Sequence, residues 1–294
     1  MSFQRYCYPP DAVRLFTVER SRQGKTGVHR VEVSEQLLKK AEEGILIVSA
    51  MGHGYLWRCA REHLMKLIYF VTEGPTDQIV IEGLIDYWLG GEDFIPRYIQ
   101  PPSSAYADGL NTNLSEGWKG VRDWCAGKRA GGPAGRDEAL NQADCLIIHI
   151  DADVATDPDF KTPAFNGPCP PAKNACDWIR DHLTSLFGGT LPANVVLCVP
   201  SQDMETWVLC ALHPDVAEEN LPIECRQKPG GLLVQRKPHR LVRRKDGRLR
   251  KETVRYQASL PAIVAGWLHC TTGISPSCPE AIRFEDDTKH TLGI

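Results

Sequence analysis

The stretch Lys66-Leu67-Ile68-Tyr69-Phe70-Val71-Thr72-Glu73-Gly74-Pro75-Thr76-Asp77 carries the clearest structural pattern in the sequence. Its opening run of aromatic and β-branched residues is typical of a buried strand. Thr76 can cap a helix, and residues 77–89 have the amphipathic spacing of one. We therefore expect the main domain to begin with a strand, a tight turn at Glu73-Gly74 and a helix.

Two further apolar runs, residues 145–150 and 194–199, are predicted strands. Each is followed by polar residues, and helices are predicted over residues 172–187 and 204–212. Strands that alternate with helices favour a parallel α/β sheet with helices on its faces.

Acidic or hydroxyl side chains follow all three predicted strands. They are Glu73 after the first, Asp151 and Asp153 after the second, and Ser201, Asp203 and Glu205 after the third. The carboxyl ends of parallel strands share one edge of a sheet, where ligands bind, so these groups can converge. Carboxylates in a cluster repel one another unless a cation lies among them, and oxygen ligands suit a hard ion such as Mg²⁺.

The order strand–Glu73-Gly74–helix, then strand–Asp151-Ala152-Asp153, resembles the Toprim domain, and most closely its OLD-like and small stand-alone nuclease members. The resemblance covers residues 66–212. It implies a Rossmann-like sheet, one or two Mg²⁺ or Mn²⁺ ions, and catalytic roles for the glutamate and both aspartates. The implied metal ligands are Glu73, Asp77, Asp151, Asp153, Ser201 and Glu205.

Simpler interpretations of these residues stay open, and for Glu73, Asp151 and Asp153 the simpler one is that acidic residues commonly begin loops and cap helices. Asp77 can be a first-turn residue favoured by the helix dipole, and Ser201 can be only a helix cap. The 78 positions between Glu73 and Asp151 exceed a minimal Toprim domain, so an insertion is expected at about 91–140.

Three regions are predicted. Residues 1–64, with β-like runs at 13–19, 28–33 and 45–50 and a helix-like run at 34–43, form an N-terminal extension or a segment packed beside the main domain. Residues 65–215 form the Toprim-like domain, and residues 216–294 form a basic α+β region.

Residues 226–255 contain 12 Lys or Arg residues against 2 acidic residues, in a chain of net charge −3. Within them, residues 241–249 predict a β-hairpin with its turn at Asp246-Gly247. Such a run is often a solvated face, but its local excess favours contact with phosphates. The predicted nucleic-acid-binding residues are Arg236, Lys237, Arg240, Arg243, Arg244 and Lys245, with Lys245 also chosen to assist catalysis.

The resemblance implies an endonuclease that cleaves DNA or RNA, an effector of anti-phage defence that acts beside an ATPase subunit supplied in trans. Gly24-Lys25-Thr26 is not a Walker A motif, because Glu19 stands where the leading glycine belongs. The alternatives are a catalytically silent subunit that binds nucleic acid or a partner, phosphoryl transfer to small nucleotides, and a topoisomerase-like role for Tyr256 or Tyr106.

The cysteines and the hydropathy favour a reduced, cytoplasmic protein without a membrane segment. The 11 cysteines form no regular framework, and no apolar stretch approaches 20 residues. The pairs Cys169–Cys176 and Cys270–Cys278 are spaced too loosely for a zinc knuckle. His149, inside an apolar strand, is expected to be a core residue.

Overall fold

The computed structural model describes residues 15–20, 26–31, 65–100, 117–127, 136–160, 171–216, 222–225, 228–272 and 278–294. The chain divides into two compact units, Met1–Met65 and Lys66–Ile294. In the first unit, β1 (Leu15–Arg20) pairs antiparallel with β2 (Thr26–Val31), close to the runs predicted at 13–19 and 28–33. The helix predicted at 34–43 and the strand predicted at 45–50 lie outside the described residues.

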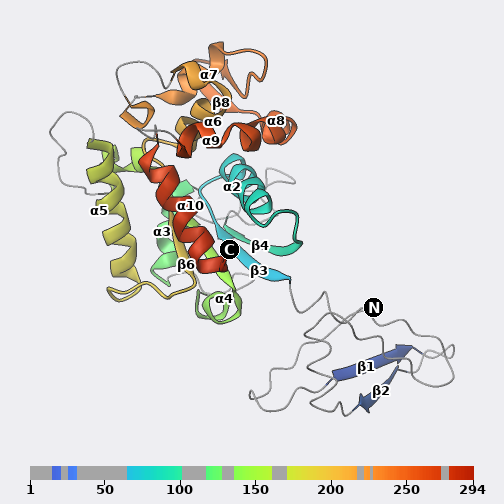
Figure 1. The fold of residues 1–294 in the computed structure, drawn as a ribbon. Helices are drawn as coiled ribbons and strands as arrows, with labels where there is room; N and C mark the ends of the chain where they lie inside the picture. Colours follow the sequence, from blue (N-terminus) through green and yellow to red (C-terminus); the bar gives the residue numbers. More distant parts are fainter. Residues whose placement is uncertain are drawn as a thin grey trace. The chain divides into compact units, whose positions relative to one another are not determined.

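A four-stranded parallel sheet forms the centre of the second unit (Figure 1). Its strands, in spatial order, are β4 (Phe94–Gln100), β3 (Lys66–Val71), β5 (Cys145–His149) and β6 (Val195–Cys198). All neighbours pair in parallel. The predicted α/β class with a parallel, helix-flanked sheet is thereby confirmed.

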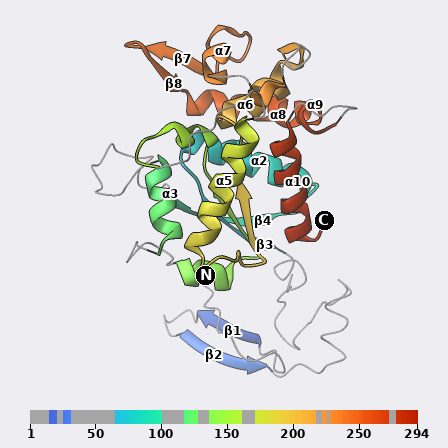
Figure 2. The same cartoon turned by 90° about the vertical axis from the view of Figure 1, so that its left-hand side faces the viewer.

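Alternate residues of each strand point to opposite faces of the sheet, and each face has its own core. On one face, Ile68 and Phe70 pack with α2 (Pro75–Trp88), α6 (Met204–Leu212) and α10 (Pro279–Leu292). On the other face, Tyr69 and Val71 pack with three helices, which Figure 2 shows from a second side. They are α3 (Gly117–Cys125), α4 (Arg136–Gln142) and α5 (Pro171–Leu186).

The stretch 91–140, predicted to be an insertion, contributes β4 to the sheet. This strand pairs in parallel with β3, and its sequence FIPRYIQ is half-buried over most of its length. Pro96 and Arg97 interrupt the apolar pattern, which an edge strand tolerates because one side carries no ladder. The sequence pattern therefore does not reveal this strand.

The elements from α6 to α9 gather at one end of the sheet (Figures 1 and 2). After α6 they are two 3₁₀ turns (Pro214–Val216, Ile223–Cys225), α7 (Pro229–Gln235), β7 (Val242–Lys245), β8 (Arg248–Lys251), α8 (Thr253–Gly266) and α9 (Leu268–Thr271). The predicted hairpin is confirmed. Asp246 and Gly247 both have positive φ, 52° and 77°, as a two-residue hairpin turn of this kind requires.

Helix α8 approaches α6 closely through Gly266. A Cβ atom at this position would lie 2.1 Å from the carbonyl oxygen of Ala211. Because backbone cannot move aside as a flexible side chain can, Gly266→Ala is expected to destabilise the protein by about 3 kcal/mol or more. Urea unfolding monitored by circular dichroism measures this change.

The matched control is Gly231→Ala in α7, where an added Cβ would meet nothing within 4 Å. Alanine has the higher helix propensity, so this variant should be as stable as wild type or gain up to about 1 kcal/mol. Equal destabilisation by both substitutions would contradict the close packing of α8 on α6.

Candidate functional site

Six carboxylates meet at the carboxyl ends of the parallel strands. One acid follows β3 and two follow β5; the others are the N-cap residue of α6 and one residue in the first turn of each of α2 and α6. They influence one another's ionisation directly. The group consists of Glu73, Asp77, Asp151, Asp153, Asp203 and Glu205, and is called the carboxylate cluster below.

Glu73 and Asp151, 78 residues apart, are joined by a hydrogen bond. The backbone N–H of Asp151 donates to Glu73 Oε1 at 2.7 Å. Burial, and then repulsion from Asp151, raise the pKa of Glu73 well above its usual value. Glu73 therefore holds a proton readily unless a cation replaces it.

Gly74 allows the turn between β3 and α2 to approach Asp77. A Cβ atom at Gly74 would lie 3.0 Å from Asp77 Oδ2, tighter than ordinary van der Waals contact. The backbone there is extended, with φ −148°. Close approach, rather than a left-handed conformation, is thus what favours glycine at this position.

Asp151 is held from two sides. Its Oδ1 accepts the backbone N–H of Met204, at the start of α6, at 3.0 Å, and lies 3.1 Å from His149 Nε2. Burial alone would raise the pKa of Asp151, but His149 and the neighbouring Lys251 outweigh it, so the pKa lies below its usual value. Asp151 is therefore the anionic centre of the cluster.

His149 is buried in β5, as expected of a core residue, but it also orients Asp151. Its Nε2 must carry the proton to donate to the carboxylate, and its Nδ1 has no hydrogen-bond partner among the described residues. Burial opposes protonation of the ring, yet the Asp151 charge more than offsets this and raises the pKa of His149. Such a histidine is suited to fixing a metal-binding carboxylate.

Lys251, at the end of β8, brings a positive charge to the cluster. Its Nζ lies 2.8 Å from Glu205 Oε2 and 3.3 Å from Asp77 Oδ1. Desolvation lowers the pKa of this ammonium group, but Asp77 and Glu205 overcome the effect and raise it well above its usual value. The Lys251 side chain is 35% exposed, so it is only partly shielded from solvent.

Tyr256, in the first turn of α8, completes the surroundings of Glu205. Its hydroxyl donates to Glu205 Oε1 at 2.5 Å, and the side chain is fully buried. Burial and the Glu205 charge raise the pKa of Tyr256 well above its usual value. A neutral, buried phenol in this position is a hydrogen-bond donor, which makes the topoisomerase-like nucleophile a poor fit; Tyr106 lies outside the described residues.

Asp203 belongs to the cluster, although its place in the sequence alone did not mark it as a ligand. Its Oδ1 is buried and has no hydrogen-bond partner among the described residues. Burial, and then repulsion from Glu205 and Asp151, raise the pKa of Asp203 well above its usual value. An unsatisfied buried carboxylate oxygen is costly, and a bound cation would satisfy it.

The donor set fits a hard divalent cation. Carboxylate oxygens dominate it, and Asp77, His149 and Asp151 each offer one atom within 4.8 Å of the others. Mg²⁺ and Mn²⁺ prefer oxygen ligands, and a single imidazole is compatible with Mn²⁺. Since His149 Nε2 already contacts Asp151, the oxygens of Glu73, Asp77, Asp151, Asp153, Asp203 and Glu205 are the better candidate ligands.

Ser201, a predicted metal ligand, is directed toward the backbone. It is fully buried, and its hydroxyl donates to the carbonyl oxygen of Glu224 at 2.5 Å. Its own carbonyl accepts the Thr206 hydroxyl at 3.0 Å. These contacts make Ser201 a residue that fixes the turn between β6 and α6.

Lys245 lies exposed beside the hairpin turn, and Lys251 is the hairpin lysine that contacts the carboxylates. Strand pairing explains the difference. Val242 is paired with Lys251 and is buried, so that pair lies on the inner face of the hairpin. Lys245 is paired with Arg248, and both belong to the opposite face.

That opposite face is strongly basic. The pairs Arg243↔Arg250 and Lys245↔Arg248 place four exposed cations on it, of which Arg243 also pairs with Glu252. The other predicted binding residues are spread out. Arg244 is exposed on the inner face, Arg236 pairs with Asp215 at 2.7 Å, and Lys237 and Arg240 are exposed before the hairpin.

Comparison with known proteins identifies no relative: the chain matches no protein-family model, no curated protein and no solved structure. Among the described helices, none has the length and apolar character that crossing a membrane requires.

Asp153 gives the metal-free protein a pH dependence. Burial, and then repulsion from Asp151, raise its pKa from 3.8 to about 7. A carboxyl group whose pKa is higher in the folded than in the unfolded state stabilises the fold at low pH, and this contribution is lost as pH rises through the folded pKa. Metal-free protein is therefore expected to lose stability from about pH 4 to about pH 8.

Urea unfolding in a chelator across this range measures the slope for wild type and Asp153→Asn. The variant, which cannot titrate at this position, should show a smaller loss, and saturating Mg²⁺ or Mn²⁺ should reverse the loss in wild type. Parallel stability profiles for the two proteins would contradict the raised pKa.

Proposed function

We propose that this protein is a Mg²⁺- or Mn²⁺-dependent endonuclease of the Toprim type that cleaves phosphodiester bonds of DNA or RNA. The observation that carries the proposal is the carboxylate cluster itself. Acids that follow three strands of one parallel sheet meet Lys251 from a distant hairpin. This arrangement has an all-oxygen donor set for hard cations and a positive charge beside it.

Bound in the cluster, one or two divalent ions would activate water and neutralise charge on the leaving oxygen. The chain's own groups prepare that site. His149 and the N–H of Met204 fix the orientation of Asp151, and Glu73 is fixed by the backbone of Asp151. Lys251 would contact a phosphate oxygen once the carboxylates hold cations.

The basic face of the hairpin supplies a surface for the nucleic-acid backbone. Its four exposed cations (Arg243, Lys245, Arg248 and Arg250) stand on the strand pair whose inner face delivers Lys251 to the cluster. Because this face points away from the carboxylates, nucleic acid bound on it would have to pass around the edge of the hairpin for a phosphate to reach the cluster. Such contacts carry affinity without sequence selectivity and weaken as salt rises.

The biological setting is proposed by family analogy alone. Small Toprim nucleases act in anti-phage defence beside an ATPase, so an ATPase subunit in trans is the proposed partner of this protein in the cytoplasm. Purification from the native host tests this: an ATPase that co-purifies supports it, and a chain that purifies without one counts against it.

A cleavage panel tests the enzymatic proposal. Wild type and Glu73→Ala are incubated with plasmid DNA, single-stranded DNA, tRNA and rRNA, each with Mg²⁺, Mn²⁺ or chelator. The expected result is metal-dependent cleavage by wild type and none by the variant. If wild type cleaves none of these substrates, with or without an ATPase partner, the nuclease proposal fails.

The second candidate function is a catalytically silent subunit that binds nucleic acid or a partner. The contacts of Lys251 favour it, because an ammonium group within 3.3 Å of both Asp77 and Glu205 can neutralise these acids without a metal ion. Binding of nucleic acid unchanged by chelator, together with a silent cleavage panel, would support this function. A third alternative, turnover of small nucleotides, is tested in the same panel with free nucleoside triphosphates.

A further inference from the structure

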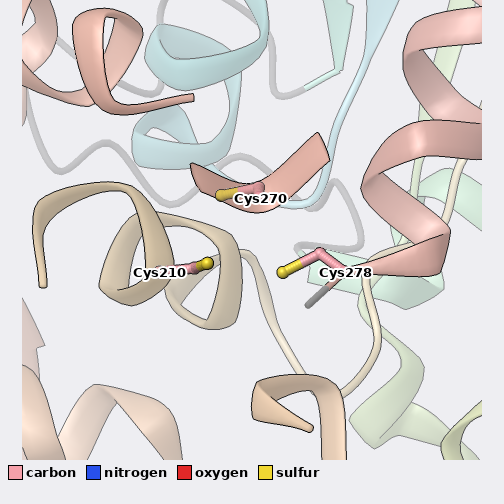
Figure 3. A group of neighbouring side chains, drawn as sticks. All are labelled: Cys210, Cys270 and Cys278. Atoms are coloured by element: carbon pink, nitrogen blue, oxygen red, sulfur yellow. The ribbon is translucent and has the colours of Figure 1, made fainter. Parts of the chain in front are cut away.

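Three buried cysteines from separate segments converge away from the carboxylate cluster (Figure 3). Cys210 lies in the last turn of α6, Cys270 in α9, and Cys278 at the N-cap of α10. Their Sγ atoms all lie within 4.8 Å of one another, and all three residues are fully buried. The loose spacing of Cys270 and Cys278 is thus completed by a third cysteine about 60 positions upstream.

We propose that Cys210, Cys270 and Cys278 bind one soft, thiophilic metal ion, Zn²⁺ or Cu⁺, as a structural site. Thiolates bound to one zinc ion, with Zn–S near 2.3 Å, lie about 3.8 Å apart. The sulfurs therefore reach bonding positions by small side-chain rotations. Thiolate ligands also select Zn²⁺ and Cu⁺ over the harder ions suited to the carboxylates.

Packing alone does not explain the grouping. The described chain has four other free buried cysteines, Cys125, Cys145, Cys176 and Cys198, and none of them joins a comparable three-residue group among the described residues. Those four act as small apolar side chains. The convergence of three sulfurs is what distinguishes this place in the fold.

The helix geometry favours thiolates in the group. Cys278 precedes the first turn of α10, a 14-residue helix, and its carbonyl accepts the N–H groups of Ala281 and Ile282. A helix N-terminus stabilises negative charge and lowers the pKa of a thiol placed there. Binding of a metal ion by the three cysteines would release their thiol protons.

The neighbouring backbone shows how the site would be completed. Cys270 Sγ donates to the carbonyl oxygen of Trp207 at 3.5 Å, and Cys210 Sγ donates to that of His269 at 3.6 Å. Three thiolates suffice for trigonal Cu⁺. For tetrahedral Zn²⁺ they leave one position, which a water or one of these carbonyl oxygens could take.

The consequence is that α6 would be fixed at both ends. Glu205 and the N–H of Met204 are at its start, and Cys210 lies five residues after Glu205, about 7.5 Å along the axis. The metal would tie this helix to α9 and α10, two elements from the C-terminal part of the chain. It would stabilise the fold that supports the carboxylate cluster without taking part in its chemistry.

Metal content of the purified chain tests the proposal. The protein is produced with Zn²⁺ or Cu⁺ supplied in separate cultures, purified in reductant without chelator, and analysed by mass spectrometry of the elements. We expect about one ion per chain in wild type and less than about a tenth of an ion in Cys210→Ser and Cys278→Ser. The metal that is retained after dialysis identifies the natural occupant.

Two control variants test whether the ion is held by these three cysteines and by no other part of the chain. Cys176→Ser removes a buried thiol outside the group, and Asp151→Asn disables the carboxylate cluster; both should retain the ion. Retention of metal in Cys278→Ser, or its loss in Asp151→Asn, would overturn the proposal. Because these outcomes do not depend on cleavage, failure here is distinct from failure of the proposed nuclease activity.

A titration of wild type removes any dependence on how the variants fold. Metal-free protein is titrated with Co²⁺, whose thiolate complexes have an intense charge-transfer absorption. Saturation at one equivalent, and displacement of Co²⁺ by Zn²⁺ or Cu⁺, are expected. Absence of this absorption, or a disulfide between any two of the three cysteines in reductant, would refute the site.

Discussion

Asp151→Asn is expected to lower the rate of metal-dependent cleavage at least about 100-fold, because loss of an outer partner of a metal site already costs about 10–100-fold and Asp151 is a proposed direct ligand. Asparagine keeps an oxygen for the N–H of Met204, so the turn into α6 is preserved. What it removes is the negative charge that His149 and Lys251 stabilise. Single-turnover cleavage at saturating Mg²⁺ or Mn²⁺ measures the effect.

Asp181→Asn is the matched control, since Asp181 is an exposed residue of α5. It should cleave at the wild-type rate, and both variants should keep wild-type affinity for nucleic acid in chelator, where the basic hairpin face alone binds. Equal cleavage by Asp151→Asn and wild type would exclude Asp151 from catalysis, and with it the proposed metal centre.

Lys251→Ala is expected to destabilise the metal-free protein by about 2 kcal/mol. Removing one partner of a fully buried ion pair costs more, but Lys251 is partly exposed, so solvent screens its charge. The substitution destabilises the protein because Asp77 and Glu205 lose their partner while they stay buried; their side chains are only 4% and 1% exposed. Without the ammonium group, each is a buried carboxylate with its main counter-charge removed. Saturating Mn²⁺ should restore part of the loss by replacing the missing charge.

Lys245→Ala serves as the comparison, because Lys245 is an exposed lysine of the same hairpin. Its stability should change by less than about 0.5 kcal/mol, while its affinity for nucleic acid falls and becomes less dependent on salt. Thermal and urea unfolding of both variants, with and without Mn²⁺, make the test. Equal stability of the two would show that the Lys251 ion pairs contribute nothing to the fold.

The sequence predicts those parts of the site that follow directly from strand ends. Glu73 and Asp151 stand after apolar runs typical of buried strands, and parallel topology brings such ends together. The start of α6 at Met204 follows from the same pattern. Local periodicity was sufficient for these elements.

Contacts between distant segments were not predictable in this way. Lys251 meets Asp77 across 174 positions, and it is one of 12 similar basic residues in its region. A usable signal was nevertheless present: with the turn at Asp246-Gly247 fixed, strand pairing sets Lys251 opposite Val242. The apolar Val242 marks the inner face, and Lys251 shares it.

The hidden strand and the cysteine group depend on tertiary structure. Pro96 and Arg97 interrupt the apolar pattern by which a strand is predicted, so β4 is not recognised from its sequence. Its position in the sheet is set by pairing with β3. Likewise, the spacing of Cys270 and Cys278 gives no metal motif until α6 brings Cys210 beside them. Only the folded chain supplies these neighbours.

Lys251 belongs to a hairpin that follows the carboxylates in the sequence, and this order matters during synthesis on the ribosome. Glu73, Asp77, Asp151 and Glu205 all emerge before it, so the nascent chain carries a concentrated negative charge at the sheet edge. Lys251 contacts Asp77 across 174 residues, so until the hairpin is made the repulsion among these acids can be relieved by bound protons or cellular cations. The order of synthesis thus adds the Lys251 counter-charge only after all of these acids have been made.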